Sequence, residues 1–265
     1  MNINIILSFH NNQARPFDHH TLQGLIYLCL TPNTHKKIHG TFPWLFCFSN
    51  IFTEKSTIYT ANKKYHVTVS SIDQEIVADL YEQMLSKKTY PFWADNQITI
   101  HTICIVPDEK VRAGKKLQAM TPVVISLDNE VCARFAIDDK REPLYRTKEH
   151  GFDVRVHQLH KNLLRKYIAL IEKGYVQRLN QWDKELLALY KQEERSLFDA
   201  FVWTCNFFSG YKYRRNAVAN YKWWYIWWSV WNLVVGDDSN GIKVIKTVLP
   251  IGFGERCTAG FGYMK

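Results

Sequence analysis

The first 106 residues carry patterned segments in an order that strongly restricts the fold. Runs that are apolar or that alternate between apolar and polar residues predict four strands, at residues 3–9, 44–52, 65–70 and 97–106. After the first and the third of these runs, apolar residues recur at helical spacing, and Asp18 and Asp73 stand where a helix N-cap is expected. The predicted order is therefore β-α-β-β-α-β.

This order is the ferredoxin-like arrangement. The polar, basic segment 107–116 contains Pro and Gly and predicts a connection between domains. Beyond it the pattern begins again less regularly, with a hairpin at 121–127 and 131–137, helices at 153–173 and 183–191, strands near 198–208 and 222–235, and a short helix, or alternatively a strand, near 242–249. We predict an α+β protein with two tandem ferredoxin-like (βαββαβ) domains, residues 1–110 and 117–265, the second carrying a C-terminal Gly-rich loop.

The charge balance favours a polyanionic partner. The chain has 34 Lys and Arg against 25 Asp and Glu, a formal charge of +9, which puts nucleic acid ahead of a membrane surface. The most apolar stretch, residues 223–235, is shorter than the roughly 20 residues of a membrane span. The start has no signal-peptide pattern and the six cysteines form no CxxC pair, so we expect a soluble, reduced, cytoplasmic protein.

Two segments have the composition of a nucleic-acid contact. The C-terminal run PIGFGERCTAGFGYMK holds two glycine–aromatic–glycine pairs around one arginine, at Gly252, Gly254, Arg256, Gly260 and Gly262. Glycines allow positive φ and let backbone N–H groups face phosphate oxygens, although a plain terminal β-hairpin would also use them. Interleaved cations and rings in segment 211–228 favour phosphate contacts and base stacking, with many of its tryptophans expected in the core instead.

Histidine is the residue type best suited to acid–base chemistry here. His39 follows the first predicted helix beside Lys36 and Lys37. Neighbouring cations disfavour the charged imidazole, so His39 could act as a base near pH 7, or it could be an ordinary surface residue. His157 and His160 lie three apart on a predicted helix, and we expect them on a solvated face rather than at a metal.

These pieces together resemble the CRISPR-associated endoribonucleases of the RAMP superfamily, which cut precursor CRISPR RNA within its repeats. The resemblance rests on LQGLIYLCL, the His-Gly loop after it, LFCFSNIF, TPVVIS and GFGERCTAGFG. It implies a metal-independent and cofactor-free reaction in which a ribose 2′-hydroxyl attacks the scissile phosphate. The products would be a 5′-hydroxyl and a 2′,3′-cyclic phosphate, and the enzyme would retain the mature guide RNA.

The resemblance also implies roles for individual residues. His39 matches the position of the general base or acid, and Tyr27 matches a position that holds a catalytic Tyr in some members. Those members also use a Lys shortly after the His, which is missing between residues 40 and 54 here. Lys36, Lys37 or Lys55 could substitute, and we include Lys37 in the predicted catalytic site.

A second histidine and the RNA-contact residues complete the expected site. His35 remains a second candidate for the catalytic imidazole. RNA would be bound by Arg214, Arg215 and Lys222, and by the Gly-rich loop.

Two other functions remain open at this point. A member of the same superfamily could bind RNA without cutting it, as a subunit of a CRISPR effector complex. Outside the superfamily, the Trp-rich segment could insert into a membrane surface. Repeat RNA, precursor and mature, is the expected partner, with effector-complex subunits as further partners.

Overall fold

The computed structural model describes residues 1–11, 19–38, 42, 45–49, 60–92, 96–121, 123, 133, 153–192, 195–221, 224–254 and 263–264. Within these ranges only the backbone is described for residues 19–21, 92, 153, 155, 195 and 211–231. The chain divides into two compact units. One holds Met1–Glu109 together with Pro250–Gly252, and the other holds Lys110–Leu249 together with Phe253.

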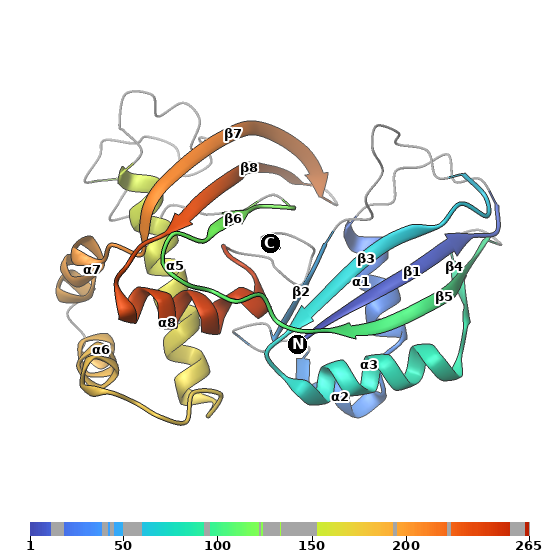
Figure 1. Ribbon diagram of the computed structural model, residues 1–265, viewed down its shortest axis with the longest axis horizontal. Helices are drawn as coiled ribbons and strands as arrows, with labels where there is room; N and C mark the ends of the chain where they lie inside the picture. Colours follow the sequence, from blue (N-terminus) through green and yellow to red (C-terminus); the bar gives the residue numbers. More distant parts are fainter. Residues whose placement is uncertain are drawn as a thin grey trace. The chain divides into compact units, whose positions relative to one another are not determined.

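The N-terminal unit is built on a five-stranded antiparallel sheet (Figure 1). Its strands are β1 (Asn2–Phe9), β2 (Phe46–Phe48), β3 (Tyr65–Ser71), β4 (Thr89–Phe92) and β5 (Asn96–Val106). They lie in the order β2-β3-β1-β5-β4, so β1 pairs with both β3 and β5. The central position of β1 agrees with its alternation, since Ile3, Ile5 and Leu7 are buried while the residues between them are half-exposed.

Two helices, α1 (His19–Leu28) and α3 (Gln74–Ser86), add buried apolar residues to this core. α3 begins at Asp73, whose carboxylate accepts a hydrogen bond from the backbone N–H of Glu75. Its Ile76, Val77, Leu80 and Met84 recur at helical spacing and are buried. The predicted β-α-β-β-α-β order is therefore confirmed in this unit.

The structure adds two elements that the pattern did not predict, α2 (Pro32–Ile38) and β4. Pro32 lies beyond the end of α1 and is the first residue of α2. Proline suits that position because the first helical N–H needs no intrahelical partner.

The C-terminal unit has a three-stranded sheet of β6 (Lys116–Gln118), β7 (Phe208–Tyr221) and β8 (Trp224–Val235), in the order β6-β8-β7. β7 and β8 form a long, curled hairpin (Figure 1). The helices are α5 (Asp153–Glu172), α6 (Gln181–Lys191), α7 (Arg195–Thr204) and α8 (Ser239–Val248), followed by the 3-10 turn η1 (Leu249–Ile251). α5 contacts both α7 and α8, and α6 contacts α7.

The strand predicted near 198–208 is wrong, because α7 occupies most of it and β7 begins only at Phe208. The apolar residues of this segment have the spacing of one helix face, at Leu197, Phe198, Phe201 and Val202. Two residues of that face, Phe198 and Val202, are buried. The short helix near 242–249 is confirmed as α8, with Asp238 as its N-cap. The hairpin predicted at 121–137 falls almost entirely outside the described residues.

The whole is an α+β protein with antiparallel sheets. The division at 110–117 into two ferredoxin-like domains stays a prediction. Across the described part of the chain, no helix combines the length and the apolar character that crossing a membrane requires.

Candidate functional site

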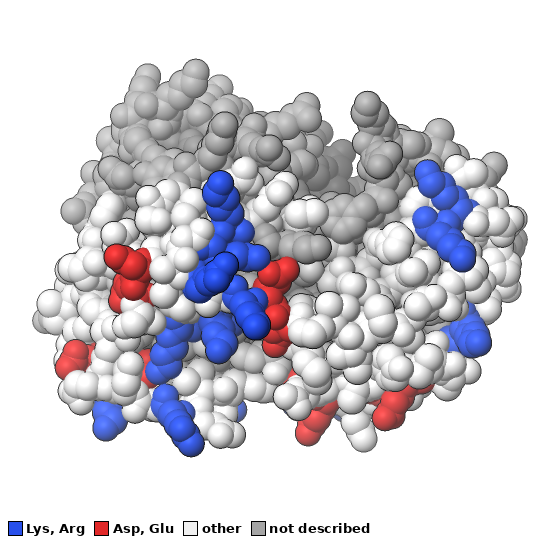
Figure 2. Space-filling view, viewed as in Figure 1, with Lys and Arg blue, Asp and Glu red and all other residues white. Residues whose placement is uncertain are grey.

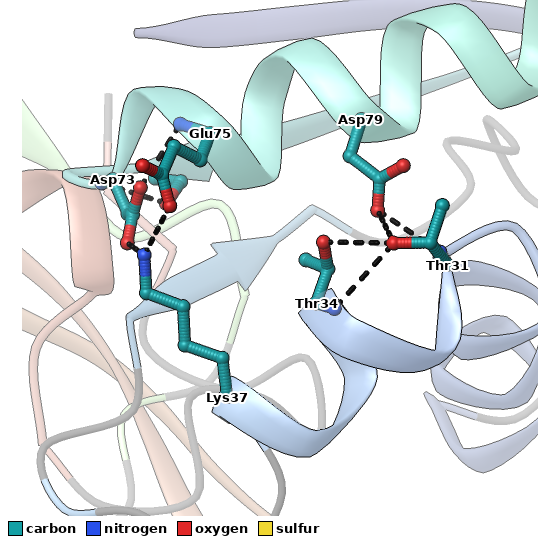
Figure 3. Close-up of polar contacts among 7 residues, drawn as sticks. Thr31, Thr34, Lys37, Asp73, Glu75 and Asp79 are labelled. Carbon is teal, nitrogen blue, oxygen red and sulfur yellow. Dashed lines mark hydrogen bonds and ion pairs between the residues drawn. The ribbon is translucent and has the colours of Figure 1, made fainter.

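The helix α2 leads directly into the predicted catalytic histidine and is fastened to α3 at its first turn (Figure 3). Thr31 donates hydrogen bonds from its backbone N–H and its hydroxyl to Asp79 Oδ2, at 2.9 and 3.0 Å. The same hydroxyl lies 3.1 Å from that of Thr34. A helix of seven residues does not persist in water alone, so these tertiary contacts fix its position.

A second attachment joins the last turn of α2 to the start of α3. The ammonium of Lys37 lies 2.7 Å from Asp73 Oδ2 and 2.6 Å from Glu75 Oε2 (Figure 3). Asp73 is buried and is also the N-cap of α3, so one carboxylate serves both helices. The structure thus places predicted Lys37 in an ion-pair cluster, and Ile38, which follows it, is fully buried.

Tyr27 and His35 meet between α1 and α2. Their ring centroids are 5.0 Å apart at an interplanar angle of 69°, and the Tyr27 ring also meets that of Phe46 edge-on at 5.9 Å. Both Tyr27 and His35 are half-buried. A phenol and an imidazole held side by side can move protons in general acid–base catalysis.

His39 lies outside the described residues, as does Gly40. The backbone leading to it is described, because α2 ends one residue earlier at Ile38. Of the three predicted catalytic residues, the structure therefore places Tyr27 and Lys37 on consecutive helices of the N-terminal unit.

The first glycine pair of the C-terminal run has the positive φ angles that glycines allow. Gly252 has φ 79° and Gly254 has φ 76°, a region that disfavours side chains. Phe253 between them is fully buried and packs on Phe208, with ring centroids 6.3 Å apart. Arg256, Gly260 and Gly262 lie outside the described residues.

Tyr263 directly follows the second glycine pair of the run and is buried. Burial raises the pKa of its phenol to about 12, so this hydroxyl stays protonated at neutral pH.

Two of the predicted cations of segment 211–228, Arg214 and Arg215, lie in β7. Arg214 stands at a register shift in β7, since Tyr213 pairs with Trp231 and Arg215 with Val230. Such a bulge bends and twists the strand. Lys222 lies outside the described residues.

A further group of cations gathers on the C-terminal unit. Figure 2 shows a band of Lys and Arg over the part of this unit where Figure 1 draws α8 and the chain leading into β6. The exposed cations of these segments are Lys110, Arg112, Lys116 and Lys246. Residues 107–116 were predicted only as a connection between domains, although their positive charge is also a signal for a polyanion contact.

His157 and His160 are not on a solvated face, which corrects that expectation. They are 3% and 4% exposed, and their rings pack on Trp203 and on Phe207, at 4.1 and 4.8 Å between centroids. Burial and the neighbouring His157 lower the pKa of His160 to about 3. Among the described residues no group of three or more His, Cys, Asp and Glu side chains could hold a metal ion.

Thr31 and Asp79 are not among the residues predicted from the sequence. Thr31 followed by Pro32 is the signature of a helix start, an N-cap type before a first-turn proline. This local signal predicts the start of α2, whereas the partner Asp79 lies 48 residues away and has no local signal.

Comparison with solved structures defines the class of fold first. No protein-family model matches the chain, and no curated protein matches its sequence. Solved structures of RAMP and Cas6 proteins do match over its whole length, so the chain has the ferredoxin-like α+β fold of that class.

Three of these structures are informative. A structure described as a RAMP protein binding different RNA substrates superposes with a TM-score of 0.64 at 13% identity, covering 100% of this chain and 98% of that one. A Cas6-related protein from Pyrococcus furiosus gives 0.64 at 16% identity, covering 100% and 97%. A CRISPR-associated protein Cas6 gives 0.59 at 17% identity, covering 100% and 98%.

Proposed function

We propose that this protein is an endoribonuclease that cuts precursor CRISPR RNA within its repeats. The observation that carries the proposal is the match of the whole chain to Cas6 and RAMP structures. It is supported by the arrangement of α1 and α2, which brings Tyr27 beside His35 and leads the backbone to His39.

The reaction needs no external nucleophile. The ribose 2′-oxygen attacks the adjacent phosphorus, the new P–O2′ bond forms and the P–O5′ bond breaks. A base accepts the 2′-hydroxyl proton and an acid gives a proton to the departing 5′-oxygen, which leaves a 2′,3′-cyclic phosphate and a 5′-hydroxyl. Positioning and acid–base catalysis are therefore the main tasks of the protein, and no metal is required.

In this proposal His39 is the general base or acid, and the Tyr27 hydroxyl orients or protonates an oxygen. Lys37 belongs to the same site. Its ion pairs with Asp73 and Glu75 favour a part in positioning α2, and with it His39.

Phosphate and base contacts come from segment 211–228 and from the Gly-rich run. Arg214, Arg215, Lys222 and Arg256 neutralise phosphates, and the backbone of the Gly-rich run, from Gly252 to Gly262, approaches the RNA closely. Repeat RNA, both precursor and mature guide, is the partner, and the protein retains the guide for transfer to effector-complex subunits.

The first prediction tests the imidazole. Labelled repeat RNA is incubated with the protein in excess EDTA, and product ends are mapped. We expect the parent to cut and His39→Ala to lose about 10²–10⁴-fold in rate, with RNA affinity unchanged. His66→Ala, an exposed histidine on β3, is the matched control and should cut normally.

Other outcomes separate the alternatives. If His35→Ala loses cleavage and His39→Ala does not, the imidazole is His35. Binding without any cleavage by the parent would point instead to a non-catalytic RNA-binding subunit. Loss of cleavage on adding EDTA alone would reject the metal-independent mechanism.

A further inference from the structure

A cavity of about 620 Å³ lies among α5, α6 and α7 of the C-terminal unit, on elements that carry none of the residues assigned above. Its size is within the usual range for small-molecule sites. Its lining residues are Lys161, Arg165, Tyr190, Lys191, Gln192, Phe198 and Asp199.

The inner wall of this cavity is a buried ion pair. Lys161 Nζ lies 2.5 Å from Asp199 Oδ1, and the two side chains are only 3% and 16% exposed. A buried charge is costly unless it is well paired, so separating Lys161 from Asp199 would be unfavourable. The pair therefore fixes α5 against α7 and gives the wall of the cavity a fixed polar surface. Phe198, buried beside Asp199 on α7, adds an apolar surface.

The rim of the cavity carries further positive charge. Arg165 is four residues after Lys161, so both lie on one face of α5, and Arg165 and Lys191 are exposed. The lining therefore has three cations against the single carboxylate of Asp199. An arginine fork and an ammonium at an open rim are suited to the oxygens of a phosphate.

An aromatic surface stands next to these cations. Tyr190 and Phe198 meet edge-on, with ring centroids 5.3 Å apart at 70°. Tyr190 is 40% exposed, which leaves part of its ring open for a planar partner. Cations beside an exposed aromatic ring are the combination with which proteins bind a phosphate and stack its base in single-stranded RNA.

We propose that this cavity binds one unpaired nucleotide of the RNA, with the phosphate at Arg165 and Lys191 and the base against Tyr190. The inference rests on the proposed function, since it requires that the protein binds RNA. It adds a contact on the helices of the C-terminal unit that neither the glycine run nor the β7–β8 hairpin supplies. A specific site here would hold the guide RNA through the unit that does not carry Tyr27 and Lys37.

The experiment measures binding of labelled single-stranded repeat RNA to the full chain over a range of salt concentrations. For single strands each phosphate contact contributes about 0.7 to the slope of log affinity against log salt. We expect the double variant Arg165→Ala, Lys191→Ala to lower the slope by about 1.4. Tyr190→Ala should weaken binding about fivefold to a hundredfold with the slope unchanged, while Tyr190→Phe retains the ring and the affinity.

Lys184→Ala is the matched control, an exposed lysine on the same helix α6 that does not line the cavity. It should leave both affinity and slope at the parental values, and circular dichroism should show all variants folded. If the parent binds RNA and the cavity variants bind like the parent, the cavity site is overturned while the proposed function stands. If the parent binds no RNA, the proposed function fails and the cavity site fails with it.

Discussion

Asp183 is a carboxylate that the fold encloses completely, with 0% of its surface exposed. Tyr167 Oη donates to its Oδ1 at 2.8 Å, the backbone N–H of Asn180 donates to its Oδ2 at 2.7 Å, and the ammonium of Lys243 forms an ion pair with the same oxygen. Burial raises the pKa of Tyr167, so its phenol remains a donor. One side chain thus joins α5, α6 and α8.

At the scale of single residues, the sequence predicted where helix-capping residues occur but not which distant residues bind them. The helix expected from Asp183 starts at Gln181, with Asn180 as N-cap and Asp183 closing a capping box. Both residues are good caps, and local sequence does not choose between them. The enclosure of Asp183 depends on Tyr167 and Lys243, which are 16 and 60 residues away, and no local pattern indicates it.

His160 makes stability depend on pH, which is the second prediction. Its folded-state pKa of about 3 lies below the ordinary value near 6.5, so the unfolded chain takes up a proton that the folded chain does not. The stabilisation is complete above pH 6.5 and is lost as pH falls toward 3, at about 1.4 kcal/mol per pH unit. Urea unfolding between pH 7 and 4.5 measures it.

The matched variants are His160→Phe, which keeps a ring against Phe207 and Phe208, and His66→Gln at an exposed position. We expect the first to reduce the pH dependence of the unfolding free energy and the second to leave it near the parental slope. Equal slopes in the parent and His160→Phe would contradict the assignment.

At the scale of elements, the patterned strands and helices of residues 3–106 were predictable because each has either a periodic apolar face or, as at β2, a continuous apolar run. α7 was mistaken for a strand because its apolar pairs, at 197–198 and 201–202, lie in a segment too short to distinguish the helical period of 3.6 residues from a short apolar strand. α2 was missed for a different reason. It has one buried residue, Ile38, and it is held by polar contacts to α3 that hydrophobic periodicity does not reveal.

The third prediction concerns that attachment. Asp79→Ala removes both hydrogen bonds from Thr31, and we expect the free energy of unfolding to fall by about 2 kcal/mol, since hydrogen bonds to charged groups are the stronger class. If α2 positions His39, the cleavage rate should also fall about tenfold or more, with RNA affinity unchanged. Urea unfolding and single-turnover cleavage measure the two effects.

Glu82→Ala, an exposed carboxylate on the same helix, is the control and should change neither quantity. Loss of stability with full cleavage activity would show that α2 does not position a catalytic group.

At the scale of the whole molecule, the charge of +9 predicted a polyanionic partner, and the band of cations in Figure 2 gives that charge a location. The composition could not predict where on the surface these cations gather, because exposed lysines follow no periodic pattern in the sequence. The cavity among α5, α6 and α7 was equally unpredictable. Its cations come from two helices, and its inner ion pair joins Lys161 to a residue 38 positions away.

The fourth prediction is that RNA affinity falls steeply with salt, because phosphates supply much of the binding free energy. Arg214→Ala and Arg256→Ala should each lower the slope of log affinity against log salt by about 0.7 and leave unfolding unchanged. Lys88→Ala, an exposed residue of the N-terminal unit, serves as the control. Parental slopes in both arginine variants would mean that the RNA contacts another surface.

The burial of the thiols has a practical consequence for reagents. Cys29 and Cys47 are buried, and burial raises the pKa of Cys29 and of Cys205 to about 12, whereas Cys104 on β5 is exposed. A thiolate is the form that alkylates, so of these four cysteines Cys104 should take up a maleimide dye first. With Cys132 and Cys257 changed to serine, a fluorophore could therefore be attached to the N-terminal sheet without disturbing its interior.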